Sequence, residues 1–411
     1  MSAGNDRGQP PGQVPPRRLF RLLADPVIGP YFASKVLAST GTWIYNIVAA
    51  IVVFDLSRSA FLVGAVSITQ FTPQVLLAPH AGASADRRDR RIQLAVGRGL
   101  VGLGAACAAL VVTSPLVEGH QAAYWVIGAS SIVGIGFAVG SPAMHSLLPG
   151  LAKPSELPTL VAIDTAPFTI ARAIGPAIGA LLLTVTGPAT AMLVAGLIQL
   201  PMCVVVLRLR PPERPKPKHR GSVWDAFRFV AQERMMVLVL LGTVGVGFAV
   251  DPVITLSPSI AADLGGDATL VAILASSFGV GAAATLLFIG PLQRRWLPRS
   301  LSQLGQFFLV TTILGLAFAP TPTTAVAILA VSGVGMMLSV TSFTTQLQQS
   351  LPDAMRGRVM ALWTVCFVGS RPLAAAVNGA VADTFSVQAA LLLLAAFLAA
   401  LMVFTRPSQL V

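Results

Sequence analysis

Five charged side chains lie inside long apolar stretches of the sequence, where they can form ion pairs or exchange protons. They are Lys35, Asp164, Arg172, Asp251 and Arg371. A charge in an apolar environment costs free energy and usually faces a partner or a water-filled cavity. A buried carboxylate can also exchange a proton, because burial favours its neutral form and a nearby cation favours its charged form. These residues therefore predict a buried charge network.

The elements that position these charges are predicted to be membrane-spanning helices. Of 411 residues, 55% are hydrophobic and 11% are charged, whereas about a quarter of the residues in a soluble domain are charged. A helix needs about 20 predominantly apolar residues to cross the hydrocarbon core. The sequence contains twelve such spans: Val27–Phe54, Phe61–Ala81, Ile92–Thr113, Ala122–Ser146, Leu157–Thr184, Ala189–Leu207, Met235–Leu256, Leu270–Gly290, Leu301–Ala319, Thr323–Thr345, Arg358–Ala382 and Val387–Phe404.

Basic residues are unevenly divided between the two sets of connections that join the spans. Alternate loops and both tails hold 23 of the 28 Lys and Arg residues, and the opposite loops hold only Arg58. Basic residues accumulate on the cytoplasmic side of membrane proteins. We therefore predict a multi-pass membrane protein with both termini in the cytoplasm, and the family resemblance given below implies that the membrane is a bacterial inner membrane. The net charge of +12 is then a topology signal, which excludes nucleic acid as a partner and leaves the lipid bilayer.

The spans divide into two related halves of six. A Gly followed by an Arg cluster occurs at residues 82–91 and again at 290–299, a duplication that is typical of secondary transporters. In the basic linker between the halves, Trp224 and Phe227 follow Ser222 at helical spacing, which predicts an amphipathic helix on the membrane surface. The predicted domains are a disordered cytoplasmic tail (1–26), an N-terminal half (27–207), the linker (208–234), a C-terminal half (235–404) and a short cytoplasmic tail (405–411).

Depth in the membrane predicts which charges meet. At ~1.5 Å per residue, Lys35 and Asp164 lie roughly 10 Å deep, and Asp251 and Arg371 roughly 20 Å deep. We predict that Lys35 pairs with Asp164 and that Asp251 pairs with Arg371. Asp251 is the first candidate for a proton-exchanging carboxylate and Asp164 the second, while a permanent ion pair that fixes helix packing is an equal alternative for Asp251. Lys35 alternatively extends to the interface, as Arg98 is expected to do.

The loop after the second span contains Gly82, Asp86, Arg87, Arg90 and Arg91. It resembles the signature loop of the major facilitator superfamily, in which a second Gly usually stands at the position of Asp89. The resemblance implies a major facilitator fold, that is, an all-α protein with twelve helices in two pseudo-symmetric halves. An acidic group at a helix end can bind helix N-termini and arginines, which predicts an inner-face gate. A basic loop that only sets topology is the alternative.

A second motif lies in the fifth span, where Gly175, Pro176 and Gly179 look like the Gly-Pro motif of exporters in this superfamily. Small residues allow close helix approach, and a proline bends the helix. Together with the segments 39–43 and 351–360, these residues resemble the enterobactin-exporter-like and drug-efflux branch. Ordinary packing by small residues explains the same pattern, so the direction of transport rests on the resemblance.

Several aromatic and thioether side chains in the spans are candidates for an adaptable, apolar cargo cavity. They are Trp43, Tyr45, Phe343, Trp363 and Phe367, together with Met336 and Met337.

We therefore expect a secondary transporter that exports small amphiphilic molecules, such as a drug, siderophore or secondary metabolite, by proton antiport and that acts as a monomer. Proton-coupled uptake is the alternative, and a non-transporting signalling protein is a more distant one. No nucleotide-binding GxxxxGK[ST] loop occurs, and the Cys and His residues lack metal-site spacing. We expect no enzyme activity, cofactor, metal or nucleotide.

Overall fold

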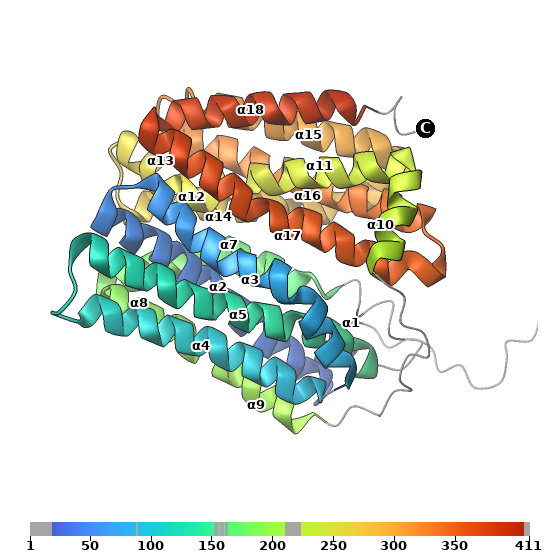
Figure 1. The fold of residues 1–411 in the computed structure, drawn as a ribbon, viewed down its shortest axis with the longest axis horizontal. Coiled ribbons are helices and arrows are strands. Elements are labelled where there is room, and N and C mark those ends of the chain that lie inside the picture. The colour runs from blue at the N-terminus through green and yellow to red at the C-terminus, as the bar shows by residue number, and fades with distance from the viewer. Residues whose placement is uncertain are drawn as a thin grey trace, which may run out of the picture.

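The computed structural model describes residues 19–87, 89–151, 156, 160, 163–209 and 223–406. The regular structure of these residues is helical throughout (Figure 1). The N-terminal half contains α1 (Leu19–Leu23), α2 (Ile28–Ser57), α3 (Ala60–Arg87), α4 (Arg90–Thr113), α5 (Gly119–Leu151), α7 (Ala166–Thr186), α8 (Pro188–Leu197) and α9 (Leu200–Arg208).

The C-terminal half follows after helix α10 of the linker. Its helices are α11 (Arg234–Val250), α12 (Pro252–Thr255), α13 (Ser257–Asp263), α14 (Ala268–Arg295), α15 (Pro298–Leu316), α16 (Pro322–Ser350), α17 (Asp353–Thr384) and α18 (Val387–Phe404), and α10 itself covers Val223–Gln232. The predicted tail up to residue 18 and the linker residues 210–222 lie outside the described part of the chain.

Eleven segments of the described chain are long and apolar enough to cross a membrane. Two of them combine consecutive helices, namely α8 with α9 and α11 with α12. The twelfth span is α15, which carries Gln303 and Gln306 among its apolar residues and packs between α16 and α18. The bundle thus has the twelve-helix, two-half arrangement predicted from the sequence.

Two helix crossings join the halves, α3 against α17 and α7 against α14. In Figure 1 the first half lies below the second, and α3 runs beside α17. Close approach at these crossings depends on glycine. A Cβ atom at Gly64 would lie 2.7 Å from the carbonyl oxygen of Ala375, and one at Gly279 would lie 2.4 Å from that of Arg172. The halves are therefore in backbone contact at both crossings.

The helices α1 and α10 and the last residues of α18 lie at one end of the bundle, on the right in Figure 1. We call this the linker end and the opposite one the distal end. The predicted linker helix is present as α10, which crosses this end and contacts α11 and α17. Its Ala226 and Val230 are buried, whereas Phe227 is exposed. The placement of α10 on a membrane surface stays a prediction.

The fifth span is interrupted where the sequence predicted one continuous helix from Leu157. Leu160 and Ile163 are helical, Asp164 and Thr165 form a turn, and the helix α7 begins at Ala166, with Pro167 in its first turn. Proline is favoured in the first helical turn, where its missing N–H leaves no hydrogen bond unmade. Asp164 therefore lies in the turn before α7 rather than inside a helix.

Candidate functional site

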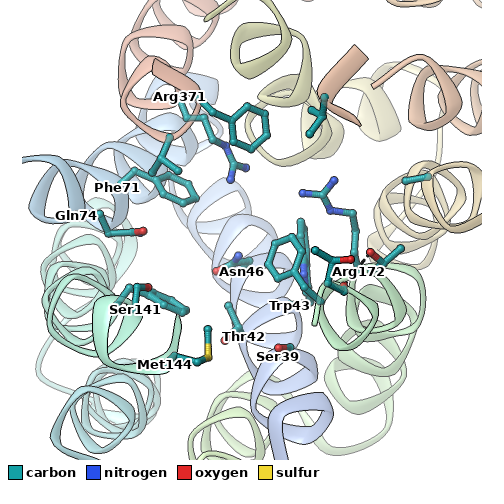
Figure 2. A pocket seen from close by; sticks show the side chains of 18 of the residues that line it. Ser39, Thr42, Trp43, Asn46, Phe71, Gln74, Ser141, Met144, Arg172 and Arg371 are labelled. Carbon is teal, nitrogen blue, oxygen red and sulfur yellow. Dashed lines mark hydrogen bonds between the residues drawn. The ribbon is translucent and has the colours of Figure 1, made fainter. Parts of the chain in front are cut away.

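A cavity of about 380 Å³ lies between the two halves, on the linker side of the two crossings. Side chains of α2, including Ser39, Thr42 and Asn46, form a polar strip on one wall (Figure 2). The amide of Gln70 on α3 donates a hydrogen bond of 2.9 Å to Asn46. Helices α5, α7, α16 and α17 supply most of the remaining wall, so both halves contribute. The described residues contain no group of three His, Cys, Asp or Glu side chains that could hold a metal ion.

Lys35 and Asp164 form the predicted ion pair at the linker end of the cavity. The Lys35 ammonium donates to the Asp164 carboxylate and, over 3.0 Å, to the Asp164 backbone carbonyl. Asp164 lies in the turn before α7, and its backbone carbonyl accepts this second bond there. The Lys35 side chain is buried, so it does not extend to the interface. The pair ties α2 to the turn before α7.

Asp251 does not pair with Arg371, and this prediction is wrong. Its carboxylate accepts hydrogen bonds of 2.8 Å each from the Asn378 amide and the Thr255 hydroxyl. Asn378 lies two turns beyond Arg371 on the same face of α17, which is about 10 Å further along the helix, so Asp251 meets α17 at a different level from the one that the depth estimate gave. Asp251 is 2% exposed and lies outside the cavity wall. Arg371 still acts on Asp251 electrostatically, over a longer distance.

Arg172 and Arg371 project into the cavity from opposite halves (Figure 2). The guanidinium of Arg172 lies 5.0 Å from the ring centroid of Trp43, and that of Arg371 lies 4.1 Å from the centroid of Phe71. The Nε atom of each arginine is buried and has no hydrogen-bond partner. Both side chains face the same space without an ion-pair partner among the described residues.

Arg98 also lines the cavity, contrary to the expectation that it extends to the interface. It is buried, donates 3.4 Å to the Gln199 side chain, and lies 5.6 Å from the ring centroid of Phe137. Gln199 lies in the short break between α8 and α9. Its polar side chain in an otherwise apolar span was the sequence signal for an internal partner.

The aromatic candidates divide into two groups. Trp43 and Phe367 line the cavity, as do Met336 and Met337. Tyr45, Phe343 and Trp363 do not line it. The Tyr45 hydroxyl is 2.8 Å from the Ser130 hydroxyl inside the N-terminal half, and Phe343 packs on the backbone of Gly242. Trp363 stacks behind Phe367, with ring centroids 5.4 Å apart. Sequence reasoning missed Phe71 and Phe168, which do line the cavity.

In the signature loop, the side chains of Asp86 and Arg87 lie outside the described part of the structure, and Gly82 lies within α3. The inner-face gate through Asp86 therefore stays a prediction.

The end of this loop is described and binds within the N-terminal half. Arg90 donates to the Ser146 carbonyl over 3.2 Å, and Arg91 donates to the Leu209 carbonyl over 2.7 Å. Asp89, which stands where the superfamily has glycine, caps α4 by accepting from the Arg91 N–H over 2.9 Å. Its side-chain hydrogen bond with Arg91 lowers the pKa of Asp89 below its usual value of 3.8. The departure from the family pattern thus supplies a helix cap.

The glycines of the Gly-Pro motif face α2. A Cβ atom at Gly175 would lie 2.5 Å from the Trp43 Cβ, and one at Gly179 would lie 2.7 Å from Ile47. Pro176 stands inside α7 between them. The motif therefore sets how closely α7 and α2 approach, and it places Trp43 at the cavity wall.

Comparison with known proteins shows which family the chain matches. The family described as "Transmembrane secretion effector", of the major facilitator type, matches residues 21–410. The chain is 27% identical over 371 residues to the enterobactin exporter EntS of Shigella boydii serotype 4 (strain Sb227), covering 88% of this chain and 86% of the exporter. It is 28% identical over 307 residues to EntS of Escherichia coli O1:K1 / APEC, covering 72% of this chain and 71% of that protein.

Solved structures of transporters share the fold. A D-xylose-proton symporter matches with a TM-score of 0.74 at 15% identity, covering 93% of this chain and 99% of the symporter. A second match is a bacterial homologue of the human lysosomal transporter Spinster in an inward-facing and unoccupied conformation. Its TM-score is 0.69 at 14% identity, and the match covers 92% of this chain and 95% of the homologue. At such identities the likeness concerns the fold alone.

Proposed function

Because the chain belongs to the transmembrane secretion effector family of the major facilitator superfamily, we propose that it exports small amphiphilic molecules, such as siderophores, in exchange for protons. It is a multi-pass inner-membrane transporter and not an enzyme. The relatives cited above are named as exporters of enterobactin, which supports export of a siderophore-like cargo by this chain.

The observation that carries the proposal is the position of the cavity. It lies between the halves on the linker side, while the two crossings close the bundle on the distal side. Basic residues concentrate in the loops and tails of the linker end, so we assign this end and both termini to the cytoplasm. The cavity then accepts cargo from the cytoplasm. Rocking of the halves about the cavity would release the cargo on the other side.

Asp251 is the proposed proton carrier. Its two hydrogen-bond partners, Asn378 and Thr255, are uncharged. Protonation of Asp251 therefore breaks no ion pair, and it removes a buried charge that is costly in an apolar interior. Protonation of Asp164 would instead disrupt its bond with Lys35. Asp164 is the second candidate because it faces the cavity.

The cavity suits a small amphiphile. Its volume of about 380 Å³ lies within the range of about 300–1,000 Å³ that is usual for small-molecule sites. Aromatic and thioether side chains such as Trp43, Phe168 and Met337 offer apolar surface, and the polar strip of α2 lines the same cavity. Because one chain encloses the cavity, we propose that the monomer is the transporting unit.

Everted membrane vesicles test this proposal. We expect wild-type vesicles that are energised to be acidic inside to accumulate at least one compound from a panel of siderophores and lipophilic drugs. A protonophore and the isosteric change Asp251→Asn should each abolish that accumulation. The matched control is Asp263→Asn, which alters an exposed carboxylate of α13 and should leave accumulation unchanged.

Each contrary outcome has a distinct meaning. Accumulation that survives Asp251→Asn but not Asp164→Asn moves the proton site to Asp164. Accumulation that survives the protonophore rules out proton coupling. If intact cells expressing the protein instead gain a panel compound in a proton-dependent manner, the transporter works in uptake and the exporter proposal is wrong.

A further inference from the structure

Building on the proposed export function, we infer that the cargo is an amphiphilic organic anion whose acidic oxygens bind between Arg172 and Arg371. The inference concerns the chemical class of the cargo and the residues that recognise it. It rests on the geometry, charge and unmet hydrogen-bonding capacity of the cavity wall.

The two arginines form a site between the halves. Arg172 lies on α7 in the N-terminal half and Arg371 on α17 in the C-terminal half, and both guanidinium groups point into the same space (Figure 2). They are close enough to interact with each other electrostatically. A carboxylate or similar acidic group placed between them can accept charge-assisted hydrogen bonds from both guanidinium groups, and such bonds are stronger than those between neutral groups.

Both arginines lack the partner that a buried cation needs. Arg172 is 5% exposed and Arg371 is 7% exposed. Among the described residues, the Nε of each has no hydrogen-bond partner, and the only side-chain hydrogen bond of Arg172 is a weak one of 3.8 Å to the Met336 sulfur. A buried guanidinium without an acceptor is costly. An anionic cargo would supply the acceptors that the described residues do not.

The charge balance of the cavity wall favours an anion over a cation. The wall contains four basic side chains, from Lys35, Arg98, Arg172 and Arg371, and one acidic side chain, from Asp164. Asp164 is engaged with Lys35. A cationic cargo would meet a surplus of positive charge in a medium of low dielectric constant, where repulsion is strong.

Aromatic rings around the arginines favour a cargo that carries its acidic group on an apolar or aromatic body. Arg172 lies within 5.0 to 5.7 Å of the ring centroids of Trp43, Phe168 and Phe278. Arg371 lies over Phe71. These rings hold the guanidinium planes in place by cation–π contact, and Trp43, Phe71 and Phe168 also line the cavity. The site therefore presents fixed cations beside an apolar surface.

This site also links cargo binding to movement of the halves. Without an anion, repulsion between Arg172 and Arg371 opposes closure of the cavity on the linker side. An anion bound between them replaces the repulsion with attraction to both halves. Cargo binding then favours the closed form because the anion interacts more strongly with that form.

Equilibrium binding to the purified full-length protein in a nonionic detergent tests the inference directly. The probes are three dansyl compounds that share one fluorophore and differ in charge: dansyl-aspartate, neutral dansyl-glycinamide and cationic dansyl-ethylenediamine. Fluorescence anisotropy should show the tightest binding for dansyl-aspartate and the weakest for the cation. Competition by inorganic phosphate and by phosphatidylglycerol micelles distinguishes an organic cargo from a free anion or a lipid headgroup.

The variants Arg172→Gln and Arg371→Gln should each weaken dansyl-aspartate binding by about tenfold or more, because each removes charge-assisted hydrogen bonds. They should leave dansyl-glycinamide binding within about twofold. Arg295→Gln, the same change at an exposed position of α14, is the matched control. Arg172→Lys and Arg371→Lys keep the charge and should retain part of the affinity. A monodisperse elution profile for each variant shows that it is folded.

The inference is overturned if the three probes bind with equal affinity. It is also overturned if neither arginine substitution weakens the binding of dansyl-aspartate. If phosphate alone or lipid alone displaces the probe, the site binds that ligand. The claim that the site binds an organic anionic cargo is then overturned. This assay needs neither a proton gradient nor transport. If dansyl-aspartate binds through the arginines but neither it nor any panel compound accumulates in energised vesicles, the export proposal fails and the anion site stands. If the vesicles export a cation and neither arginine substitution changes that export, the export proposal stands and the anion site fails.

Discussion

The carboxylate of Asp383, near the end of α17, accepts a hydrogen bond of 2.7 Å from the backbone N–H of Ala60, the first residue of α3. It also accepts from the N–H of Phe61 over 3.1 Å and from the hydroxyl of Ser59. A residue of one half thus caps a helix of the other. A carboxylate at a helix N-terminus satisfies free N–H groups and interacts favourably with the helix dipole. At Gly379, one turn earlier, a Cβ atom would lie 2.6 Å from the Phe61 Cα.

Because this cap holds the distal end closed, we predict that Asp383→Ala shifts the protein toward a form that is open at the distal end. Loss of a helix cap costs about 1 kcal/mol, which corresponds to about a fivefold gain in that form. Electron spin resonance distances between labels at Leu116 and Phe385, two exposed distal positions in opposite halves, should show a larger population at long distance. The background would lack the native cysteines Cys107, Cys203 and Cys366.

The control for this experiment is Asp263→Ala, which removes an exposed carboxylate at the same end. An unchanged distance distribution in Asp383→Ala, or an equal shift in Asp263→Ala, would show that the Asp383 cap does not hold the distal end closed.

The Lys35–Asp164 pair predicts strongly non-additive mutations. Lys35→Ala removes the ammonium partner of the carboxylate and should lower the free energy of unfolding by ~3 kcal/mol, since removing one partner of a buried ion pair is strongly destabilising. Asp164→Ala should do the same to Lys35. The double variant should lose less than the two single losses together, by ~1 kcal/mol or more. Thermal unfolding in detergent measures the stability of the wild type, the two single variants and the double variant. Additive losses of stability would show that the two side chains act independently.

Most of the fold was predictable from the sequence because a bilayer imposes the length and polarity of each span. The predicted span 358–382, for example, lies within α17, and the predicted span 270–290 lies within α14. The turn at Asp164 and Thr165 was not predictable in the same way. Residues 157–165 are apolar enough to continue a span, and the position of Pro167 is the sequence signal for a helix start at Ala166.

Depth along the spans predicted one of the two charge contacts in the candidate site but not the other. Sequence position places Lys35 and Asp164 at one level, and they meet. It also places Asp251 near Arg371, but the axial offset of α11 against α17 brings Asn378, about 10 Å further along the helix, to the carboxylate instead. Such an offset depends on packing between residues 127 positions apart, which no local pattern records. For the same reason, Phe71 was not recognised as a neighbour of Arg371.

Close packing of α7 on α2 predicts that a single methyl group at Gly175 is harmful. The new Cβ would lie 2.5 Å from the Trp43 Cβ, an atom fixed to the backbone that cannot rotate away. We expect Gly175→Ala to lower the free energy of unfolding by ~1–3 kcal/mol through overpacking. Gly99→Ala is the control, because a Cβ there meets open space and alanine favours a helix by up to ~1 kcal/mol. Equal thermal midpoints for the two variants would contradict the packing argument.

The N-cap of α4 predicts a pH-dependent stability that can be assigned to one residue. The hydrogen bond from Arg91 lowers the pKa of Asp89 in the folded protein below its usual value of 3.8. A carboxyl group with a lowered pKa in the folded state stabilises the protein above its unfolded pKa, and this contribution disappears as the pH falls through the folded value. The contribution of Asp89 should therefore be complete above about pH 3.8 and decline below it.

Asp89→Asn isolates this effect, because asparagine still caps a helix but has no charge for Arg91. We expect its thermal midpoint to lie below that of the wild type at pH 7 and the difference to shrink as the pH falls below about 3.8. Salt should reduce the difference at neutral pH, since the Asp89 and Arg91 side chains are partly exposed and screened by ions. Differential scanning fluorimetry of both proteins across pH supplies the measurement. A difference that stays constant down to the lowest pH at which both proteins remain folded would mean that Asp89 stabilises α4 through its shape alone and not through its charge.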